Sequence, residues 1–450
     1  MSEQQPPKKT FSPRSIAFDE FRRKQVSAFG GRAFPPEEHL MILEDHLGVS
    51  LRRRWNAFPL FKLQMALLTD LIDAEKAVAA CKTKLEEVKA EAETRQREQD
   101  IESLEAQQQM HSAIRRALRD IGDGIAWRLF DYDRASLSVL ATHARKPHVN
   151  LDGLAAELGA LAELWNQTQG LAILNDLTHF LKKADLTFRH DANNFEFVEV
   201  KSSRTKSGTL SRQRADLVET LNFLTEGEGE RRGETVRLRS VPVRPAAYFK
   251  AVEPVLKEAQ RTGTASAVIG EHLTVEFVDW ITALDSLPDL TKLEKVRAVA
   301  DRWAKGGDIV IRSFGTDRYH LVRNFAPYSI YPFDPMLRVK LMTGTMVSVS
   351  RLNISAVVRY IASKGWTIVR GPESHLSEAA SEDEPRDVPV ATFKKGGLTL
   401  ELPTTFLARI AHEYLAPRSI VEAFEALLRA GPGEAGSMLI NFEGEADLWD

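Results

Sequence analysis

The residues best suited to chemistry in this sequence are two acids and a lysine, Asp185, Glu199 and Lys201. Two carboxylates held close together repel each other unless a cation lies between them, and carboxylate oxygens suit Mg²⁺ or Mn²⁺ better than zinc. A neighbouring ammonium group could orient a metal-bound water or stabilise charge that develops on a phosphoryl oxygen. We therefore expect a hydrolytic site at these three residues, with Mg²⁺ or Mn²⁺ as cofactor.

Two predicted strands, separated by the turn formers His190–Asn194, must position these side chains. If the strands form a hairpin whose loop holds three or four residues, Asp185 lies opposite Glu199 or Val200. Directly opposed residues have Cβ atoms about 5 Å apart. Glu199 and Lys201 are two residues apart on one strand and so project from the same face. The three side chains should converge at one end of the hairpin.

Basic residues cluster directly after this hairpin. They are Arg204, Lys206, Arg212 and Arg214, and no acidic residue interrupts them before Asp216. The whole chain has 60 Lys and Arg against 63 Asp and Glu, a net charge of −3, which excludes histone-like binding through bulk charge. A polyanion needs a local cationic strip on such a chain, so we expect these four residues to bind nucleic acid.

Along the chain, Asp185 is followed by a turn and then by the tripeptide Glu199-Val200-Lys201. This pattern resembles the motif of the PD-(D/E)xK nuclease superfamily, which has the restriction-endonuclease-like fold. The resemblance covers about residues 121–226, a quarter of the chain. It implies that Asp185, Glu199 and the backbone carbonyl of Val200 bind the divalent metal. It also implies that Lys201 contacts the nucleophilic water.

The resemblance implies two further site residues outside the hairpin. One is a Gln on the following helix, which Gln213 matches, and the other is an acid on a helix ahead of the core. Asp123 is our choice for that acid, with Glu163 and Asp176 as alternatives. A solvated helix face for Gln213 and a helix cap for Asp123 remain competing interpretations. The chain departs from the family motif at Ala184, where the motif has Pro.

A short motif carries a risk of chance matches, and this sequence contains its own control. Glu87-Val88-Lys89 is the same tripeptide within a predicted helix, where positions i and i+2 point away from each other. The copy at Glu199-Val200-Lys201 differs in context. A strand that carries Asp185 precedes it, and a basic strip and a helix follow it. The competing interpretation is a surface hairpin whose Glu199 and Lys201 form a weak ion pair.

A stripe of apolar residues with alternating steps of three and four predicts a long helix over 69–120. The stripe consists of Leu71, Ala74, Val78, Cys81, Leu85, Val88 and Ala92. Polar residues interrupt it at Arg95 and Gln99. A few interrupted heptads are marginal as a free coiled coil. Packing of this helix on its own protein is therefore favoured over a homodimer through 71–92.

Composition and pattern predict a multidomain chain of the α+β or α/β class. Helical patterns continue over 151–183, and a Gly-rich loop is expected at 226–233. The predicted segments are a helical region with a mobile tail (1–68), the coiled-coil-like helix (69–120), a nuclease-like domain with a restriction-endonuclease-like mixed sheet (121–233), a mixed α/β domain (234–370), an acidic linker (371–389) and a C-terminal hairpin with helices (390–450).

Several classes of protein are excluded by composition. The single cysteine, Cys81, excludes a disulfide framework and a Cys-rich zinc module. No apolar stretch reaches the roughly 18 residues that cross a bilayer, so we expect a cytoplasmic protein without a membrane partner. The phosphate-loop motif of ATP-driven motors does not occur. The aromatic run of Phe325, Tyr328, Tyr331 and Phe333 fits core filling better than base stacking.

The favoured function is that of a Mg²⁺-dependent endonuclease that hydrolyses phosphodiester bonds, with DNA favoured over RNA as the substrate. By analogy of context, such a chain resembles proteins of restriction or antiphage defence. Two alternatives stay open. One is an inactive module of the same fold that binds nucleic acid or a partner protein, and the other is an assembly protein that acts through its coiled-coil helix.

Overall fold

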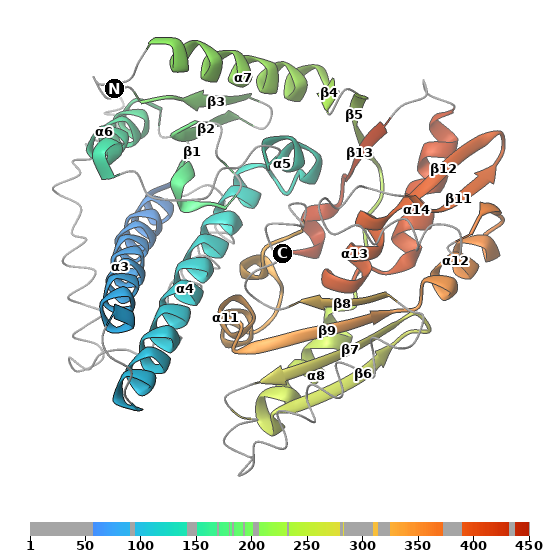
Figure 1. The fold of residues 1–450 in the computed structure, drawn as a ribbon. Helices are drawn as coiled ribbons and strands as arrows, with labels where there is room; N and C mark the ends of the chain where they lie inside the picture. Colours follow the sequence, from blue (N-terminus) through green and yellow to red (C-terminus); the bar gives the residue numbers. More distant parts are fainter. Residues whose placement is uncertain are drawn as a thin grey trace, which may run out of the picture. The chain divides into compact units, whose positions relative to one another are not determined.

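The structure is a computed structural model of the 450-residue chain. It describes residues 57–90, 95–141, 151–168, 171–179, 181, 184–191, 194–200, 207–231, 234–279, 282, 309–313, 325–371, 389–431 and 437–449. Helices combine with small, mostly antiparallel sheets, which makes the fold mixed α+β (Figure 1). The chain forms two compact units: unit 1 is Met1–Tyr132 with Val139–Glu226, and unit 2 is Asp133–Ser138 with Gly227–Asp450.

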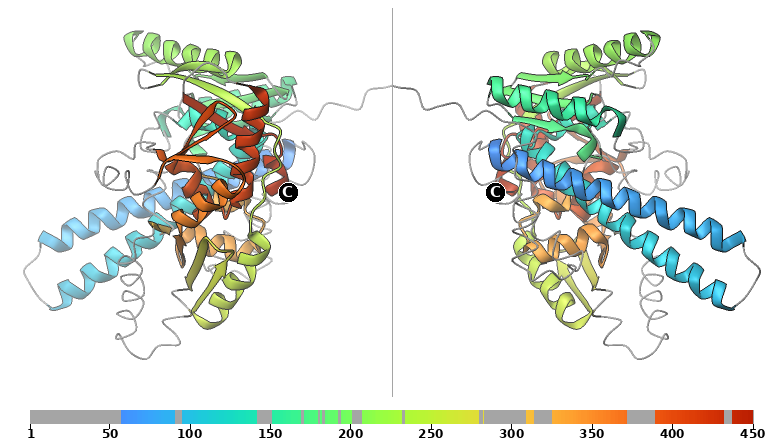
Figure 2. Two further views of the ribbon diagram at one scale, coloured as in Figure 1. Left: turned by 90° about the vertical axis from the view of Figure 1, so that its right-hand side faces the viewer. Right: turned by 90° about the vertical axis from the view of Figure 1, so that its left-hand side faces the viewer.

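The described part of unit 1 begins with two long helices, α3 (Ala57–Ala90) and α4 (Arg95–Leu129), which pack side by side (Figures 1 and 2). Lys89 near the end of α3 forms an ion pair with Glu105 of α4 at 3.2 Å, and Arg97 donates to the carbonyls of Val88 and Lys89. The sequence predicts one long helix over 69–120, whereas the structure has two helices that fold back on each other.

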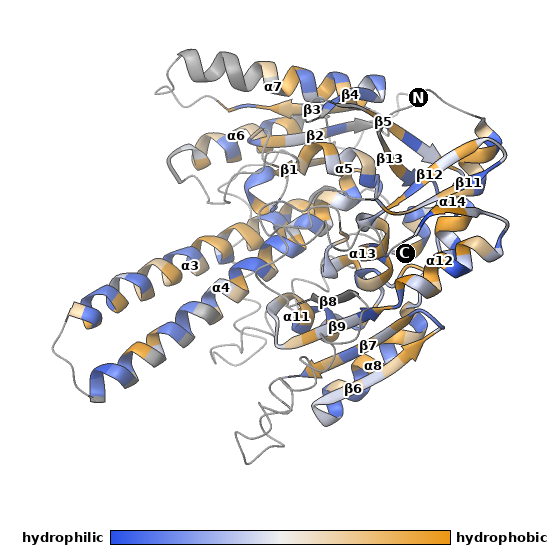
Figure 3. Cartoon of the chain, turned by 45° about the vertical axis from the view of Figure 1, so that its right-hand side comes forward, coloured by the Kyte–Doolittle hydropathy of each residue, from blue (hydrophilic) through white to orange (hydrophobic). Residues whose placement is uncertain are grey.

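The apolar stripe of α3 is covered within one chain. Leu71, Ala74, Cys81 and Leu85 are buried, and Val78 is half-buried. Figure 3 shows that the first half of the facing helix α4 is mostly hydrophilic, so the apolar contact is concentrated nearer the sheet. These residues of the stripe therefore pack within the chain, and a homodimer through 71–92 stays a prediction.

A three-stranded antiparallel sheet in the order β1-β2-β3 follows in unit 1. Its strands are β1 (Leu171–Leu174), β2 (Leu186–Asp191) and β3 (Asn194–Val198). The short 3₁₀ helix η2 (Asn175–Leu177) follows β1, and the sheet is flanked in sequence by α6 (Leu151–Thr168) and α7 (Ser207–Glu226). The predicted helical pattern over 151–183 is wrong beyond Thr168, because β1 and η2 replace it.

The outer edge of β1 is completed by a side chain. Gln64 of α3 is buried, and its Nε2 donates to the carbonyl of Ala172 at 2.8 Å. Its Oε1 accepts from the backbone N–H of Leu174 at 2.9 Å. A buried strand edge must have its backbone groups paired. Gln64 therefore takes the place of a neighbouring strand and ties the sheet to the helical pair.

The described residues of unit 2 form three further sheets, in the orders β13-β5-β4, β6-β7-β9-β8 and β10-β11-β12. The strands are β4 (Glu228–Arg231), β5 (Glu234–Val241), β6 (Thr264–Ile269), β7 (Leu273–Asp279), β8 (Ile309–Ser313), β9 (Met346–Leu352), β10 (Thr367–Arg370), β11 (Pro389–Lys395), β12 (Leu398–Pro403) and β13 (Ser437–Phe442). The Gly-rich segment 226–233 was expected to be a loop, but it contains β4, which pairs with β5.

Helices also occur in the described part of unit 2. They are α8 (Phe249–Thr262), α11 (Pro335–Thr343), α12 (Ile354–Ser363), α13 (Thr404–His412) and α14 (Pro417–Ala430), with the 3₁₀ helices η4 (Tyr328–Ile330) and η6 (Glu445–Leu448). Helix α5 (Arg134–Leu140) begins in unit 2. None of the helices that the structure describes is both long and apolar enough to cross a membrane.

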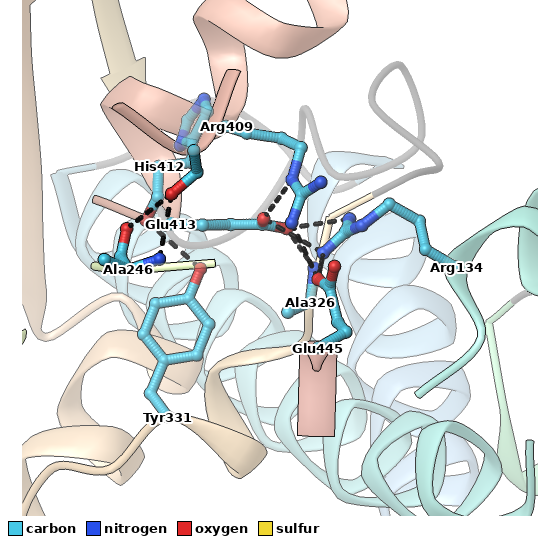
Figure 4. Close-up of polar contacts among 9 residues, drawn as sticks. Arg134, Ala246, Ala326, Tyr331, Arg409, His412, Glu413 and Glu445 are labelled. Carbon is cyan, nitrogen blue, oxygen red and sulfur yellow. Dashed lines mark hydrogen bonds and ion pairs between the residues drawn. The ribbon is translucent and has the colours of Figure 1, made fainter. Parts of the chain in front are cut away.

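Aromatic rings and buried charges fill the interior of unit 2. Tyr328, Tyr331 and Phe333 are buried, and Phe249 packs against the last two, which confirms core filling for the aromatic run. Beside them lies a buried group of two arginines and two glutamates, which we call the ionic quartet (Figure 4). It consists of Arg134, Arg409, Glu413 and Glu445.

Candidate functional site at the open end of the β2–β3 hairpin

The register of the β2–β3 hairpin brings the two candidate acids together. Leu186 pairs with Val198 and Thr187 pairs with Phe197. One step further along the same register, Asp185 falls opposite Glu199. The backbone N–H of Asp185 donates to the carbonyl of Val198 at 3.2 Å. This is one of the two registers that the sequence predicts.

The carboxylate of Asp185 is held by the opposing strand. Its Oδ2 accepts from the backbone N–H of Val200 at 2.7 Å. Burial is the largest influence on this group and raises the pKa of Asp185. The hydrogen bond from Val200 opposes that shift, and the nearby charge of Asp176 adds to it. The Asp185 carboxylate is therefore costly to ionise, and it is held in one orientation.

Glu199 is the second carboxylate of the site and is half-buried. Burial, and then the charge of Asp185, raise the pKa of Glu199 to about 7. Within the described part of the chain, no hydrogen bond or ion pair reaches this carboxylate. The pair Asp185 and Glu199 thus carries negative charge that no described cation neutralises.

The remaining residues expected near the hairpin fall outside what the structure describes. Lys201, Arg204 and Lys206 lie outside the described residues. Arg212, Gln213 and Arg214 lie on α7, but their side chains are not among those described. The roles expected for these six residues therefore stay predictions.

Asp123 binds a partner within unit 1, and its expected role at a metal stays a prediction. It lies on α4 and is buried, and its two carboxylate oxygens bind one residue, His179. Oδ1 accepts from the backbone N–H of His179 at 2.8 Å, and Oδ2 lies 2.7 Å from the ring Nδ1. Of the two alternatives, Glu163 is exposed on α6, while the charge of Asp176 reaches Asp185. Asp176 is thus the acid that is electrostatically coupled to the hairpin.

The turn that carries Asp176 is fixed on helix α4. Arg119 is buried, and its Nη1 donates to the carbonyl of Asp176 at 2.5 Å and to the carbonyl of Thr178 at 3.3 Å. One turn further along α4, Gly122 approaches Leu177 so closely that a Cβ at this glycine would lie 2.0 Å from the Leu177 carbonyl oxygen. Sequence reasoning did not find Arg119 or Gly122, since their partners are more than 50 residues away.

The donor set suits a hard divalent cation in part. Among the described residues, no group of three or more His, Cys, Asp or Glu side chains is arranged to hold a metal ion. Two adjacent carboxylates with raised pKa values are present, and Asp176 adds negative charge nearby. Oxygen ligands of this kind fit Mg²⁺ or Mn²⁺, which bind through one or two carboxylates and retain water.

Comparison of the chain with protein-family models, curated proteins and solved structures finds no match.

Proposed function

We propose that unit 1 is a metal-dependent nuclease whose metal-binding carboxylates are Asp185 and Glu199. One observation carries the proposal: two opposed carboxylates, both with a raised pKa, share one end of a hairpin without a neutralising cation among the described residues. Concentrating negative charge in a partly buried place is unfavourable unless a ligand compensates for it. A divalent cation would supply that compensation.

Each residue of the site has a defined part in this proposal. Asp185 is oriented by the N–H of Val200, so that it can offer its other oxygen to the metal. Glu199 supplies the second carboxylate, and the carbonyl of Val200 a further oxygen ligand. Bound Mg²⁺ or Mn²⁺ would polarise the phosphodiester and lower the pKa of water. Lys201 would orient the attacking water and stabilise charge on the phosphoryl oxygens.

The residues around these ligands would complete a nucleic-acid site. Asp176 takes the place proposed for Asp123 as the third acid, because its charge acts on Asp185. Gln213 would assist from α7. The basic residues Arg204, Lys206, Arg212 and Arg214 would contact the phosphate backbone, with DNA favoured over RNA. The restriction-endonuclease-like core and a role in restriction or antiphage defence belong to the same proposal.

Incubation with nucleic acids tests this function directly. Purified protein is mixed with plasmid, linear duplex, single-stranded DNA and RNA in the presence of Mg²⁺, Mn²⁺, Ca²⁺ or EDTA. We expect cleavage with Mg²⁺ or Mn²⁺ and none with EDTA. Asp185→Asn, Glu199→Gln and Lys201→Met should each lower the rate by at least about a hundredfold.

A matched control exists within the same unit. Glu87 and Lys89 form the identical Glu-Val-Lys tripeptide on α3, where both side chains are exposed. The variants Glu87→Gln and Lys89→Met should cleave at the wild-type rate. Cleavage that persists in Asp185→Asn, or that is lost equally in the control variants, would show that the assigned site is wrong.

A second candidate function is binding of nucleic acid without cleavage. The observation that favours it is that the described residues contain no complete three-ligand metal group. A binding module would retain DNA in EDTA, and its affinity would fall steeply with salt. Affinity measured in EDTA at two salt concentrations, together with the cleavage assay, separates the two functions.

A further inference from the structure

Asn175 is the first residue of η2, between β1 and the hairpin, and it is buried at 1% exposure. We infer that Asn175 is the positioning residue that sets the place of Asp185, an inference that rests on the function proposed above. Sequence reasoning assigned no role to this residue. Three hydrogen bonds from Asn175 hold the backbone around Asp185.

Three of the hydrogen bonds of Asn175 reach Asp185 and the residues on both sides of it. Its backbone N–H donates to the carbonyl of Asp185 itself at 3.0 Å. Its side-chain Nδ2 donates to the carbonyl of Ala184 at 2.9 Å. Its Oδ1 accepts from the hydroxyl of Thr187 at 2.8 Å. The backbone that carries the acid is therefore held at positions 184, 185 and 187 by one buried residue.

This support is needed because Asp185 lies one residue beyond the last ladder pair, Leu186 with Val198. The end of a short strand frays unless further contacts hold it. An amide side chain suits the position, since it donates and accepts at once, whereas a carboxylate would face the Ala184 carbonyl with no proton to donate. Leaving the buried partners of Asn175 unpaired would also cost stability.

Asn175 is itself fixed to a rigid element. The turn that it begins is bound to α4 through Arg119 and packs on Gly122. The position of Asp185 is therefore fixed by the long helix α4, through this turn, as well as by the facing strand. Residues that orient metal ligands in this way are often as important as the ligands themselves.

The N–H of Val200 offers a direct probe of this arrangement, because it donates to Oδ2 of Asp185. Hydrogen exchange of the Val200 amide, measured by NMR, reports whether the Asp185 carboxylate stays in place. In Asn175→Ala, we expect this amide to exchange about tenfold faster. We also expect the Mn²⁺ concentration at half-saturation to rise about tenfold, with cleavage recovered at high Mn²⁺.

Two further variants keep the experiment interpretable. Thr187→Val removes only the hydroxyl that binds Oδ1 of Asn175, so it should give a smaller change in the same direction and can replace Asn175→Ala if that variant does not fold. Asn353→Ala removes a side chain that caps α12 in unit 2, where its Oδ1 accepts from the N–H of Ala356 at 2.8 Å. This control should lose stability without changing Val200 exchange or Mn²⁺ half-saturation.

The readouts separate failure of this inference from failure of the proposed function. If Val200 exchange is unchanged in folded Asn175→Ala, the positioning role is overturned, whether or not the protein cleaves DNA. If Val200 exchange accelerates while the wild-type protein neither binds Mn²⁺ nor cleaves, Asn175 does position Asp185 and the proposed nuclease function is overturned. Faster Val200 exchange together with a higher Mn²⁺ concentration at half-saturation supports both the positioning role and the nuclease function.

Discussion

The backbone N–H of Val200 donates to Oδ2 of Asp185 at 2.7 Å. Asp185 lies directly before β2, and it is therefore held by the residue that follows Glu199 on the facing strand. The strand register places Asp185 opposite Glu199. The two carboxylates then act on each other, because the charge of Asp185 raises the pKa of Glu199. Their coupling leads to the first two predictions.

Replacing Asp185 with Asn should lower the pKa of Glu199 from about 7. Burial is the larger cause of the raised pKa and persists in the variant, so the pKa should fall only part of the way to its ordinary range. A carbon-detected NMR titration of Glu199 in EDTA measures this shift. A Glu199 pKa that does not move in Asp185→Asn would show that the two carboxylates are not coupled.

The raised pKa of Glu199 also makes stability depend on pH. The folded state keeps a proton on Glu199 up to about pH 7, whereas the unfolded chain releases it near its ordinary pKa. Stability from this group is therefore present in acid and is lost as pH rises through 7. Glu199→Gln should remove that loss. At pH 8 its free energy of unfolding should exceed that of the wild type by on the order of 1 kcal/mol, a figure that is reduced because Glu199 is partly exposed.

Urea unfolding in EDTA at pH 5 and pH 8 checks this prediction, with Glu87→Gln on the exposed face of α3 as the control. Added Mn²⁺ should stabilise the wild-type protein at pH 8 more than at pH 5, because metal binds the deprotonated carboxylates. Equal pH dependence in wild type and Glu199→Gln would contradict the assignment of the raised pKa.

Gly122→Ala should destabilise unit 1, because the new Cβ would lie 2.0 Å from the carbonyl oxygen of Leu177. Forced repacking of this kind costs about 1–3 kcal/mol. The matched control is Gly159→Ala on α6, where nothing lies within 4 Å of the added Cβ. Alanine in an exposed helix interior should stabilise by about 0.5–1 kcal/mol. Thermal or urea unfolding shows whether each alanine lowers or raises the stability of the protein.

Arg134→Met should strongly destabilise unit 2 through the ionic quartet (Figure 4). Arg134 binds Glu413 and Glu445 at 2.8 Å each, and Arg409 binds the same two acids at 2.7 Å. Removing one guanidinium leaves two buried carboxylates with a single cation, which costs about 3–5 kcal/mol.

The control for the quartet is an exposed ion pair in the same unit. Arg261 and Glu258 of α8 lie 2.7 Å apart at the surface, and Arg261→Met should cost at most about 1 kcal/mol. Denaturant unfolding that is monitored by the tryptophans compares the variants. A similar loss of stability in Arg134→Met and Arg261→Met would show that the quartet adds nothing beyond a surface pair.

Local patterns predicted several elements well. The hairpin register followed from alternating side chains on either side of a short run of turn formers, which leaves few possible pairings. The hairpin with helices that was expected at the C-terminal end of the chain matches β11, β12, α13 and α14. The apolar stripe of α3 correctly indicated packing within the chain, but it did not show where that helix ends and α4 begins.

Other elements had no local signal. The strand β1 is a run of four apolar residues, and such a run has no period that separates a strand from a buried helix turn. The strand β4 has the sequence Glu-Gly-Glu-Arg, which does not favour a strand by itself. It forms because β5 offers it a partner. Strand formation in both places is decided by distant neighbours.

The sequence by itself limited Asp185 to a place opposite Glu199 or Val200, because both strands belong to one hairpin and short-range pairing leaves few registers. The structure selects Glu199. Only the tertiary structure decided what surrounds them. It paired Asp123 with His179 and coupled Asp176 to Asp185. It also placed Gln64 at the edge of β1, and Asn175 and Arg119 at the turn before the hairpin. These contacts join residues up to 110 positions apart, and packing of helices on a sheet leaves no periodic trace of such pairs in the chain.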